Sequence, residues 1–365
     1  MKFLKSLSCM CLIWGLLVIL TGCPSTANMA GFGNGSESSN LSNPSNNTTP
    51  KGLVNFSFFD TVSYVYSYAG DANEVFEANV NGVWETLKEY HQLFDIYYEY
   101  SGVTNLKTLN KNAGGEAMVV DRKLVDFLLY AQELYEATGG EMNIMMGSVL
   151  KLWHDSREAS GAAGIPTADA LAEANLHTDI SSLEIDTENC TVRISDPLAS
   201  IDVGALGKGY ATEMAAQYLK NLGTESYVLN IGGNIRIIGT KLDGSGWKTG
   251  IKNPADTSSF ASYITISDTS CVTSGDYERY FVVDGKKYHH IIDKDTLMPA
   301  NYFSSVTIIT SDSGLADALS TALFSMSYED GLALVQKLGG VDVLWITSDG
   351  TQYMTEGYSR LIAEK

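Results

Sequence analysis

Residues 200–219, SIDVGALGKGYATEMAAQYL, run from an apolar residue and an aspartate through a glycine-rich turn into a helical pattern. Backbone N–H groups at the start of a helix attract anions, and Lys208 would add a positive charge at that point. The spacing differs from both common nucleotide-binding loops. A Walker A loop has four residues between its first glycine and its Gly-Lys pair, whereas two residues separate Gly204 from Gly207, and the chain has no GxGxxG motif. The stretch therefore indicates either a phosphate-binding loop of another type or a structural turn with a solvent-exposed lysine.

The segments on either side of this stretch mix helices with short strands. Helical spacing of apolar residues, with capping residues at several ends, predicts helices over 74–94, 122–137, 168–174, 209–222 and 314–326. Runs of β-branched and aromatic residues predict strands over 54–69, 227–231, 235–240, 247–252, 262–266, 271–274 and 304–310. Two hairpins are predicted at the Asp284-Gly285 and Asp349-Gly350 turns. Hairpins mixed with packed helices predict an α+β fold with mixed, largely antiparallel sheets.

The N-terminal residues differ in composition from the rest of the chain. Two lysines precede a short apolar run at 12–20, which is too short for a comfortable transmembrane span and is typical of a secretory signal. The next residues, LTGC, resemble a bacterial lipobox, which predicts a signal peptide over 1–22 and a lipid on Cys23. An ordinary signal peptide with a cysteine nearby is the alternative. Ser, Asn, Gly and Pro dominate 23–52 and predict a flexible tether, so the folded domain is expected over 53–365.

Charge and cysteine content limit the possible functions. The formal net charge of −19 argues against nucleic-acid binding, because no basic stripe could neutralise a phosphate backbone. With the signal removed and Cys23 lipidated, Cys190 and Cys271 remain, and the sequence leaves open whether they form a disulfide. The chain has no CxxC motif and no Cys/His cluster, so zinc is not expected.

Two pairs of side chains have the chemistry of a catalytic site. Asp317 and Thr321 are spaced i and i+4, so they share one face of the predicted helix. Carboxylate and hydroxyl oxygens suit Mg²⁺, although a capping aspartate and a core threonine would explain the same pair. His289 and His290 are neighbours on a predicted strand and point to opposite faces, so only one can face a given site. That histidine could act as a base, and ordinary edge-strand hydrogen bonds are the alternative.

Three further segments carry weaker signals. The two glycines of NIGGNI (230–235) indicate either a close approach of backbone or a tight structural corner. TSGDYER (273–279) is a polar turn before the first hairpin. ATGGEMNIMMGSVLKLW (137–153) leaves a helix and becomes apolar, which favours a methionine-rich core or a flat ligand pocket.

The order of these motifs resembles that of the FAD:protein FMN transferase family, also called the ApbE family. TGGEMN with LW, then DVGALGKGY, NIGGNI, TSGDYER, HHIID and DALSTAL follow one another between Phe58 and the C-terminus. The resemblance implies an Mg²⁺-dependent transferase that cleaves FAD, attaches the FMN half to a Thr or Ser of a partner protein by a phosphoester bond, and releases AMP. The implied partner is an extracytoplasmic electron-transfer subunit. With the lipobox, the expected location is the cell membrane, by a lipid anchor on the extracytoplasmic face.

The resemblance also implies roles for individual residues. Asp317 and Thr321 match the metal-binding positions of the family, together with the backbone carbonyl of Ala205, and Asp317 is expected to be catalytic. His290 is expected to act as the base or to position the substrate. Contacts with FAD are expected from Phe59, Tyr97, Glu141, Met142, Asn143, Asp202, Lys208 and Ile292. The chain departs from the family at Asn143, where Asp is commoner, at FFDT in place of Met-Gly-Thr, and at DKDTLMP in place of Asp-Pro-x-Thr-Gly.

Two other functions fit the same motifs. One is a metal-dependent FAD pyrophosphatase, which would use water in place of the protein hydroxyl and release FMN and AMP. The other is a lipoprotein that binds FAD without turnover, although the Asp317 and Thr321 pair argues against it, since holding FAD requires no metal. A flavoprotein oxidoreductase is a weaker possibility, because no redox-active cysteine pair supports it.

Overall fold

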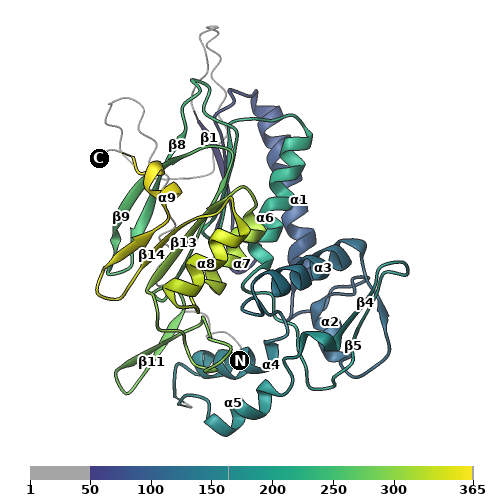
Figure 1. The fold of residues 1–365 in the computed structure, drawn as a ribbon. Coiled ribbons are helices and arrows are strands. Elements are labelled where there is room, and N and C mark those ends of the chain that lie inside the picture. Colours follow the sequence, from purple (N-terminus) through teal and green to yellow (C-terminus); the bar gives the residue numbers. More distant parts are fainter. Residues whose placement is uncertain (1–49, 163, 364–365) are drawn as a thin grey trace, which may run out of the picture.

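An eight-stranded sheet forms the centre of the molecule in the computed structural model, which describes residues 50–162 and 164–363 (Figure 1). All its neighbouring strands run antiparallel. The strand order is β1 (Lys51–Asn55), β2 (Ser63–Ser67), β6 (Tyr227–Ile231), β7 (Asn234–Ile238), β10 (Ser270–Gly275), β13 (Ser305–Thr310), β14 (Asp342–Ile346) and β15 (Gln352–Met354). The predicted α+β class with a largely antiparallel sheet is confirmed.

The two faces of this sheet are covered by different elements. Along β13, Ile308 packs with α7 (Ser313–Ala322) and α8 (Tyr328–Leu338), whereas its neighbour Ile309 packs on the opposite side. This alternation follows from the two-residue period of a strand. The first face also holds α6 (Gly207–Asn221), with α1 (Asn73–Phe94) beside it (Figure 1). The second face carries a hairpin of β8 (Trp247–Asn253) and β9 (Asp256–Ile266), and also α9 (Glu356–Leu361).

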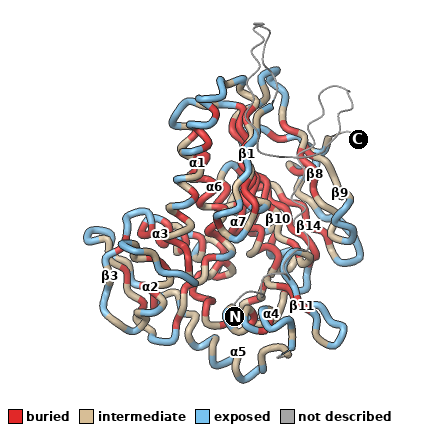
Figure 2. Tube along the Cα trace, turned by 180° about the vertical axis from the view of Figure 1, so that it is seen from behind, coloured by how far each residue is buried: buried red, intermediate tan, exposed pale blue. Residues whose placement is uncertain are grey.

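The remaining elements form a second group, which lies in the lower part of the view in Figure 1. This group contains α2 (Leu106–Lys111), β3 (Met118–Val119), α3 (Arg122–Ala137), α4 (Gly147–Glu158), α5 (Ala168–Asn175), the short 3-10 helix Ile180–Ser182, β4 (Leu183–Asp186), β5 (Thr191–Ile194), β11 (Tyr280–Val283) and β12 (Lys286–His289). Buried residues concentrate in the central strands and in the helices packed on them (Figure 2). The loop that joins β5 to α6 links the two groups, and it ends at the N-terminus of α6, beside α7, where the candidate site lies.

Several predicted elements need correction. The single strand predicted over 54–69 is wrong, because the chain turns between β1 and β2, with positive φ at Phe59 (55°) and Asp60 (49°). The strand predicted through the two histidines stops at His289. The apolar segment over 137–153 contains the start of α4, which the sequence did not reveal. The helices predicted at 74–94, 122–137 and 168–174 are confirmed as α1, α3 and α5.

Two open questions from the sequence receive answers. Cys190 and Cys271 are both free, so they form no disulfide. Gly232 and Gly233 form the turn between β6 and β7 with φ of 57° and 94°, which makes NIGGNI a tight corner. Within the described residues, none of the helices has the length and apolarity to cross a membrane. The predicted signal peptide, Cys23 and nearly all of the tether lie outside the described residues.

Candidate functional site

The N-terminal end of α6 meets α7 at the glycine-rich loop. Leu206 stands at the N-cap position, and its side chain makes no cap hydrogen bond. Instead, the Gly209 amide donates to Oδ2 of Asp317 on α7 at 2.8 Å, and Lys208 Nζ lies 3.8 Å from the same oxygen. Position 209 must be glycine, since a Cβ there would lie 2.3 Å from the carbonyl oxygen of Ser313 and from Cβ of Asp317. The loop is therefore a close crossing of two helices, with a buried carboxylate between them.

One of the predicted metal ligands, Asp317, lies at this crossing. The Gly209 amide belongs to the first turn of α6, where amides have no carbonyl partner within the helix, and the Asp317 carboxylate supplies its acceptor. The carbonyl of Ala205, also predicted as a ligand, lies just before this turn. Thr321 follows one turn after Asp317 on the same face of α7. Burial raises the pKa of the Asp317 carboxyl, while Lys208 and the Gly209 N–H act in the opposite direction. A carboxylate, a carbonyl and a hydroxyl are oxygen donors that fit Mg²⁺.

A metal at this position would rely on that mixed set of donors. Within the part of the chain that the structure describes, no group of three or more His, Cys, Asp or Glu side chains could hold a metal ion. Mg²⁺ commonly takes one or two carboxylates and completes its shell with phosphate oxygens and water. The single carboxylate of Asp317 is therefore compatible with a metal that is shared with a phosphate ligand.

Asp202 lies at the start of the same loop, beside the segment that precedes α4. Its backbone N–H donates to the Ile144 carbonyl at 2.8 Å, and its Oδ1 accepts from the Gly204 amide at 2.8 Å. Burial raises the pKa of the Asp202 carboxyl, and the Gly204 amide opposes this, as do the positive charges of Arg157 and Arg279. Through these hydrogen bonds Asp202 holds the glycine-rich turn against residues 141–147.

His290 and His289 have different environments. The His290 backbone N–H donates to the Arg279 carbonyl at 3.0 Å, and its buried Nδ1 has no hydrogen-bond partner among the described residues. Burial lowers the pKa of His290 to about 3, helped by the positive charges of Arg279 and Lys208, so the ring is neutral at neutral pH. By contrast, His289 Nε2 lies 2.8 Å from the Ala300 carbonyl, and its ring meets Phe324 edge-on. His290 is therefore the histidine with a nitrogen still available to a ligand.

A group of side chains from α4 and the β10–β11 turn was missed by the sequence reasoning. Arg157 Nη2 lies 2.8 Å from His154 Nδ1, and the His154 ring lies 5.6 Å from the ring of Tyr97. Burial lowers the pKa of Arg157, and the like charge of Arg279 lowers it further. His154 and Arg157 are one turn apart on α4, so the i, i+3 spacing would have shown them together had this helix been recognised.

The other predicted FAD-contacting residues fall into two groups. In the first group, Tyr97 is 52% exposed, and Glu141 is largely buried and pairs with Lys294 at 3.3 Å. Burial raises the pKa of Glu141, and Lys294 counteracts this shift. Phe59 is half-buried, with its amide 3.3 Å from His91 Nδ1.

The second group is occupied by contacts within the protein. Asn143 Nδ2 donates to the Thr178 carbonyl at 2.9 Å, and its Oδ1 accepts from the Met145 amide at 2.9 Å. Met142 is buried in the main hydrophobic core. Ile292 is half-buried and forms an isolated bridge with Pro299 outside the predicted strand. Contacts of either group with FAD stay predictions.

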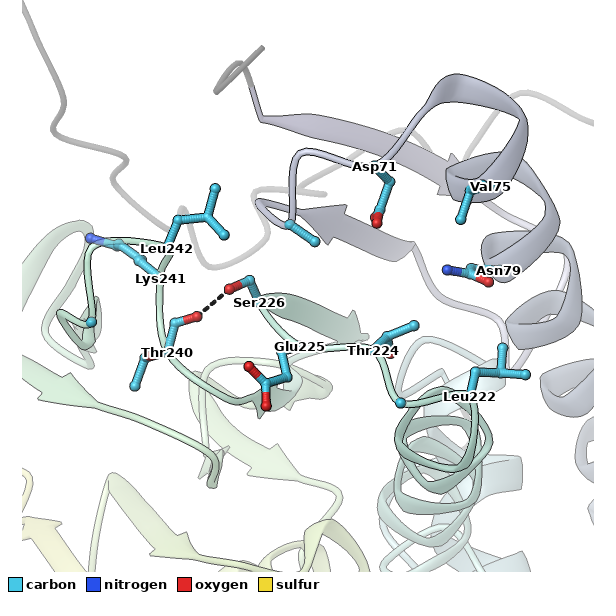
Figure 3. A pocket seen from close by; sticks show the side chains of 13 residues that line it. Asp71, Val75, Asn79, Leu222, Thr224, Glu225, Ser226, Thr240, Lys241 and Leu242 are labelled. Carbon is cyan, nitrogen blue, oxygen red and sulfur yellow. Dashed lines mark hydrogen bonds between the residues drawn. The ribbon is translucent and has the colours of Figure 1, made fainter. Parts of the chain in front are cut away.

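A separate pocket of about 610 Å³ lies at the opposite end of α6 (Figure 3). It is lined by the residues that follow this helix, by the start of α1 and by the loop after β7. Asp71 lies in its wall and accepts from the hydroxyls of Ser67 and Tyr227. None of the predicted site residues lines this pocket, so it is distinct from the α6–α7 site.

Comparison with known proteins identifies the class of this fold and site. A family model described as the ApbE family matches residues 60–345. The FAD:protein FMN transferase of Treponema pallidum is 36% identical over 259 residues, which cover 67% of this chain and 71% of that protein. The one from Klebsiella pneumoniae is 30% identical over 275 residues, which cover 75% of this chain and 83% of the relative. The crystal structure of an ApbE protein from Thermotoga maritima matches with a TM-score of 0.76 and 30% identity, covering 87% of this chain and 100% of the other.

These matches make the chain a transferase. More specifically, it belongs to the ApbE family, as the order of its motifs predicted.

Proposed function

We propose that this protein is a flavin transferase that uses FAD as its substrate and a protein as its acceptor. A Thr or Ser hydroxyl of the acceptor attacks the phosphorus on the FMN side of the FAD diphosphate. The bond to the AMP phosphate breaks, AMP leaves, and the FMN phosphate becomes joined to the hydroxyl oxygen. The observation that carries the proposal is the buried Asp317 carboxylate between the Gly209 amide and Lys208, in a chain of this family.

The residues of the site would supply the functions that phosphoryl transfer needs, which are positioning and charge neutralisation. Lys208, at the start of α6, would hold phosphate oxygens with its side chain. His290 is neutral with an unpaired Nδ1, so it would accept a hydrogen bond from the attacking hydroxyl and act as the base or position the substrate. Asp317, Thr321 and the Ala205 carbonyl would hold Mg²⁺. When bound, this ion would neutralise the charge that develops on the diphosphate oxygens.

We also propose how the protein is placed in the cell. The lipobox at Cys23 and the polar segment after it support a lipid anchor and a tether, with the catalytic domain over 53–365 on the extracytoplasmic face of the cell membrane. An acceptor that is an electron-transfer subunit exposed on that face would be within reach. Metabolic labelling with a tritiated fatty acid would test the anchor: label in the wild type and none in Cys23→Ala is the expected result, and equal label in both would refute it.

The deciding experiment uses the protein without residues 1–23. It is incubated with FAD, Mg²⁺ and a candidate acceptor domain that carries a Ser or Thr target. An acceptor mass raised by one FMN, together with AMP, is the expected result. AMP and free FMN without a mass change, across several acceptor domains, would replace the proposal with the pyrophosphatase alternative. Bound FAD without any AMP would overturn the catalytic proposal and favour a carrier.

A further inference from the structure

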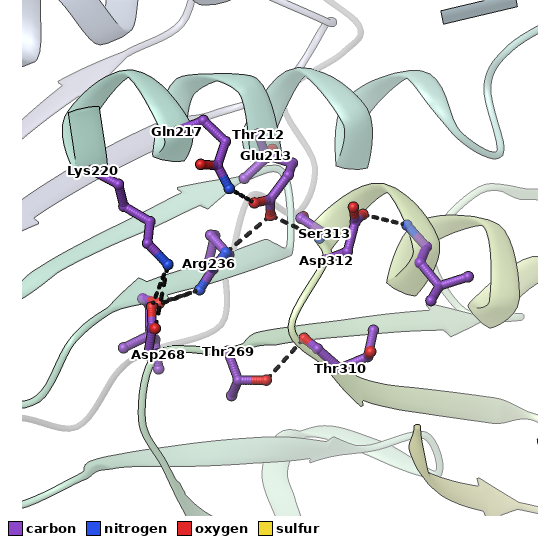
Figure 4. A network of polar contacts seen from close by, with 12 residues as sticks. Thr212, Glu213, Gln217, Lys220, Arg236, Asp268, Thr269, Thr310, Asp312 and Ser313 are labelled. Atoms are coloured by element: carbon purple, nitrogen blue, oxygen red, sulfur yellow. Dashed lines mark hydrogen bonds and ion pairs between the residues drawn. The ribbon is translucent and has the colours of Figure 1, made fainter. Parts of the chain in front are cut away.

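A buried ion pair lies next to the site, between α6 and the start of α7 (Figure 4). Glu213 on α6 is 4% exposed, and Arg236 on β7 is 2% exposed. Glu213 Oε2 accepts from Arg236 Nε at 3.0 Å, and its Oε1 accepts from Gln217 Nε2 at 2.7 Å. Burying two charges costs free energy, which the attraction between them need not offset. An ion pair buried at this place therefore calls for an explanation beyond stability.

The third hydrogen-bond partner of Glu213 supplies that explanation. Its Oε2 also accepts the backbone amide of Ser313 at 3.0 Å, and Ser313 is the first residue of α7. Figure 4 shows Glu213 placed between Arg236 and this helix start. The carboxylate thus binds the N-terminal end of α7 directly, while Arg236 holds the carboxylate in place from the sheet.

The hydrogen bond between Glu213 and Ser313 lies one helical turn away from the hydrogen bond between Gly209 and Asp317 at the site. Glu213 follows Gly209 by four residues on α6, and Asp317 follows Ser313 by four residues on α7, so these residues lie on the facing sides of the two helices. One hydrogen bond joins Gly209 to Asp317, and the other joins Glu213 to Ser313. Two hydrogen bonds at a spacing of one turn fix both the separation of the helices and the rotation of α7 relative to α6.

We propose that Glu213 is a positioning residue, which holds α7 so that Asp317 and Thr321 present their oxygen atoms to a metal ion at the α6 N-terminus. The proposal rests on the proposed function for the role of that metal, and it concerns how this chain prepares the ligands. Arg236 serves by fixing the Glu213 carboxylate. Asp268, which accepts from Arg236 Nη1 at 3.4 Å and pairs with Lys220 at 3.1 Å, belongs to the outer part of the network and does not contact α7.

Three variants separate this role from plain stabilisation. Glu213→Gln keeps an oxygen acceptor for the Ser313 amide and for Arg236. The double variant Glu213→Leu with Arg236→Met removes the acceptor without leaving a buried charge unpaired, an exchange that is often neutral for stability. Asp268→Asn changes the outer pair only and is the matched control.

The experiment measures Mn²⁺ binding by electron paramagnetic resonance, with FAD present, and the unfolding temperature of each variant. For the double variant we expect a folded protein whose Mn²⁺ dissociation constant is raised about tenfold or more, the usual effect of losing an outer partner of a metal ligand. Glu213→Gln should stay within about threefold of wild type, and Asp268→Asn should match it. Where the transfer reaction is active, kcat should fall in the double variant with little change in KM for FAD.

Wild-type Mn²⁺ affinity in a folded double variant would overturn the proposal. If the double variant fails to fold, Glu213→Gln decides the matter together with Glu213→Ala. A metal affinity that is lost in Ala and kept in Gln supports the role, and equal loss in both refutes it. A failure of the proposed function shows differently: wild-type protein would bind Mn²⁺ and modify no acceptor.

Discussion

The two ends of α6 satisfy their backbone groups in different ways. At the C-terminal end the chain caps itself: the Leu222 amide donates to Leu219 and Lys220, and Gly223 takes a positive φ of 74°. At the N-terminal end no side chain of the loop provides the cap, and the Gly209 amide reaches a carboxylate 108 residues further along the chain. A helix end closed by its own neighbours serves the fold. The end that depends on a distant charged group is the one where we propose the ligand site.

The largest effect is expected from replacing Asp317, whose carboxylate accepts a hydrogen bond from the N-terminal end of α6. Asp317→Ala removes the proposed metal ligand and the acceptor of the Gly209 amide, so FMN transfer should fall by about a thousandfold or more while the protein remains folded. Mass spectrometry of the acceptor measures the loss of FMN transfer, and circular dichroism of the variant checks that it remains folded. Full activity in a folded Asp317→Ala protein would show that the metal assignment is mistaken.

The second prediction compares a glycine at each end of the helix. Gly209→Ala places a Cβ 2.3 Å from the Ser313 carbonyl oxygen, so it forces α6 and α7 apart and should cost about 3 kcal/mol of unfolding free energy, with loss of activity. Gly223→Ala meets no atom within 4 Å and bears only its positive φ, which costs about 1 kcal/mol. Urea denaturation of both variants measures the difference. Equal costs would mean that the helix crossing is looser than described.

The third prediction concerns pH. The pKa of His290 is lowered to about 3, so in the folded protein the ring stays neutral while the unfolded chain takes up a proton below its ordinary pKa of 6.5. The contribution of His290 to stability is therefore present above pH 6.5 and is lost as the pH falls from 6.5 towards 3. Relative to His290→Gln, the wild type should lose up to about 1.4 kcal/mol per pH unit in that window.

Denaturation of both proteins at pH 7, 6 and 5 tests this slope. Parallel pH profiles for wild type and variant would show that His290 titrates normally. The transfer rate should likewise show no acidic limb with a pKa near 6.5 that His290 accounts for.

The smallest effect is expected from the lysines. Lys208→Ala removes a positive charge beside Asp317 and should weaken FAD binding by about tenfold, the value of one charge-assisted hydrogen bond. Lys220→Ala, at the other end of the same helix, removes only an ion pair with Asp268 and should leave FAD binding unchanged. Titration of flavin fluorescence measures both. Equal affinities for FAD in the two variants would show that Lys208 is a solvent-exposed lysine with no role in FAD binding.

The sequence predicted the parts of the site that depend on local pattern. The spacing of Asp317 and Thr321 placed them on one face of a helix. The different environments of His289 and His290 were also expected, although β12 ends at His289 and strand alternation does not extend to His290. What it missed depends on distant segments. Arg157 lies on α4, whose start is obscured by the glycines and the methionine-rich run before it. The Glu213 and Arg236 pair could not be foreseen, because a buried ion pair between a helix and a strand leaves no periodic signal.

For the fold, too, the sequence predicted the elements that depend on local pattern and missed features that local composition does not indicate. Helices with clear caps, such as α3 after Asp121, were predicted with their bounds. The turn between β1 and β2 was missed because it uses non-glycine residues at positive φ, which local composition does not indicate. Whether Cys190 and Cys271 form a disulfide was left open by the sequence, and the fold shows that both are free.

The hydrogen bond between Gly209 and Asp317 also has a consequence for how the protein gains activity as it folds. Its two residues are 108 positions apart, so the loop between them must close before the site exists, and such non-local contacts form slowly. A chain still emerging from the ribosome would carry the glycine-rich loop long before α7 arrived. Folding order would thus delay catalysis until the sheet is almost complete, so that an unfinished chain would leave the flavin pool untouched.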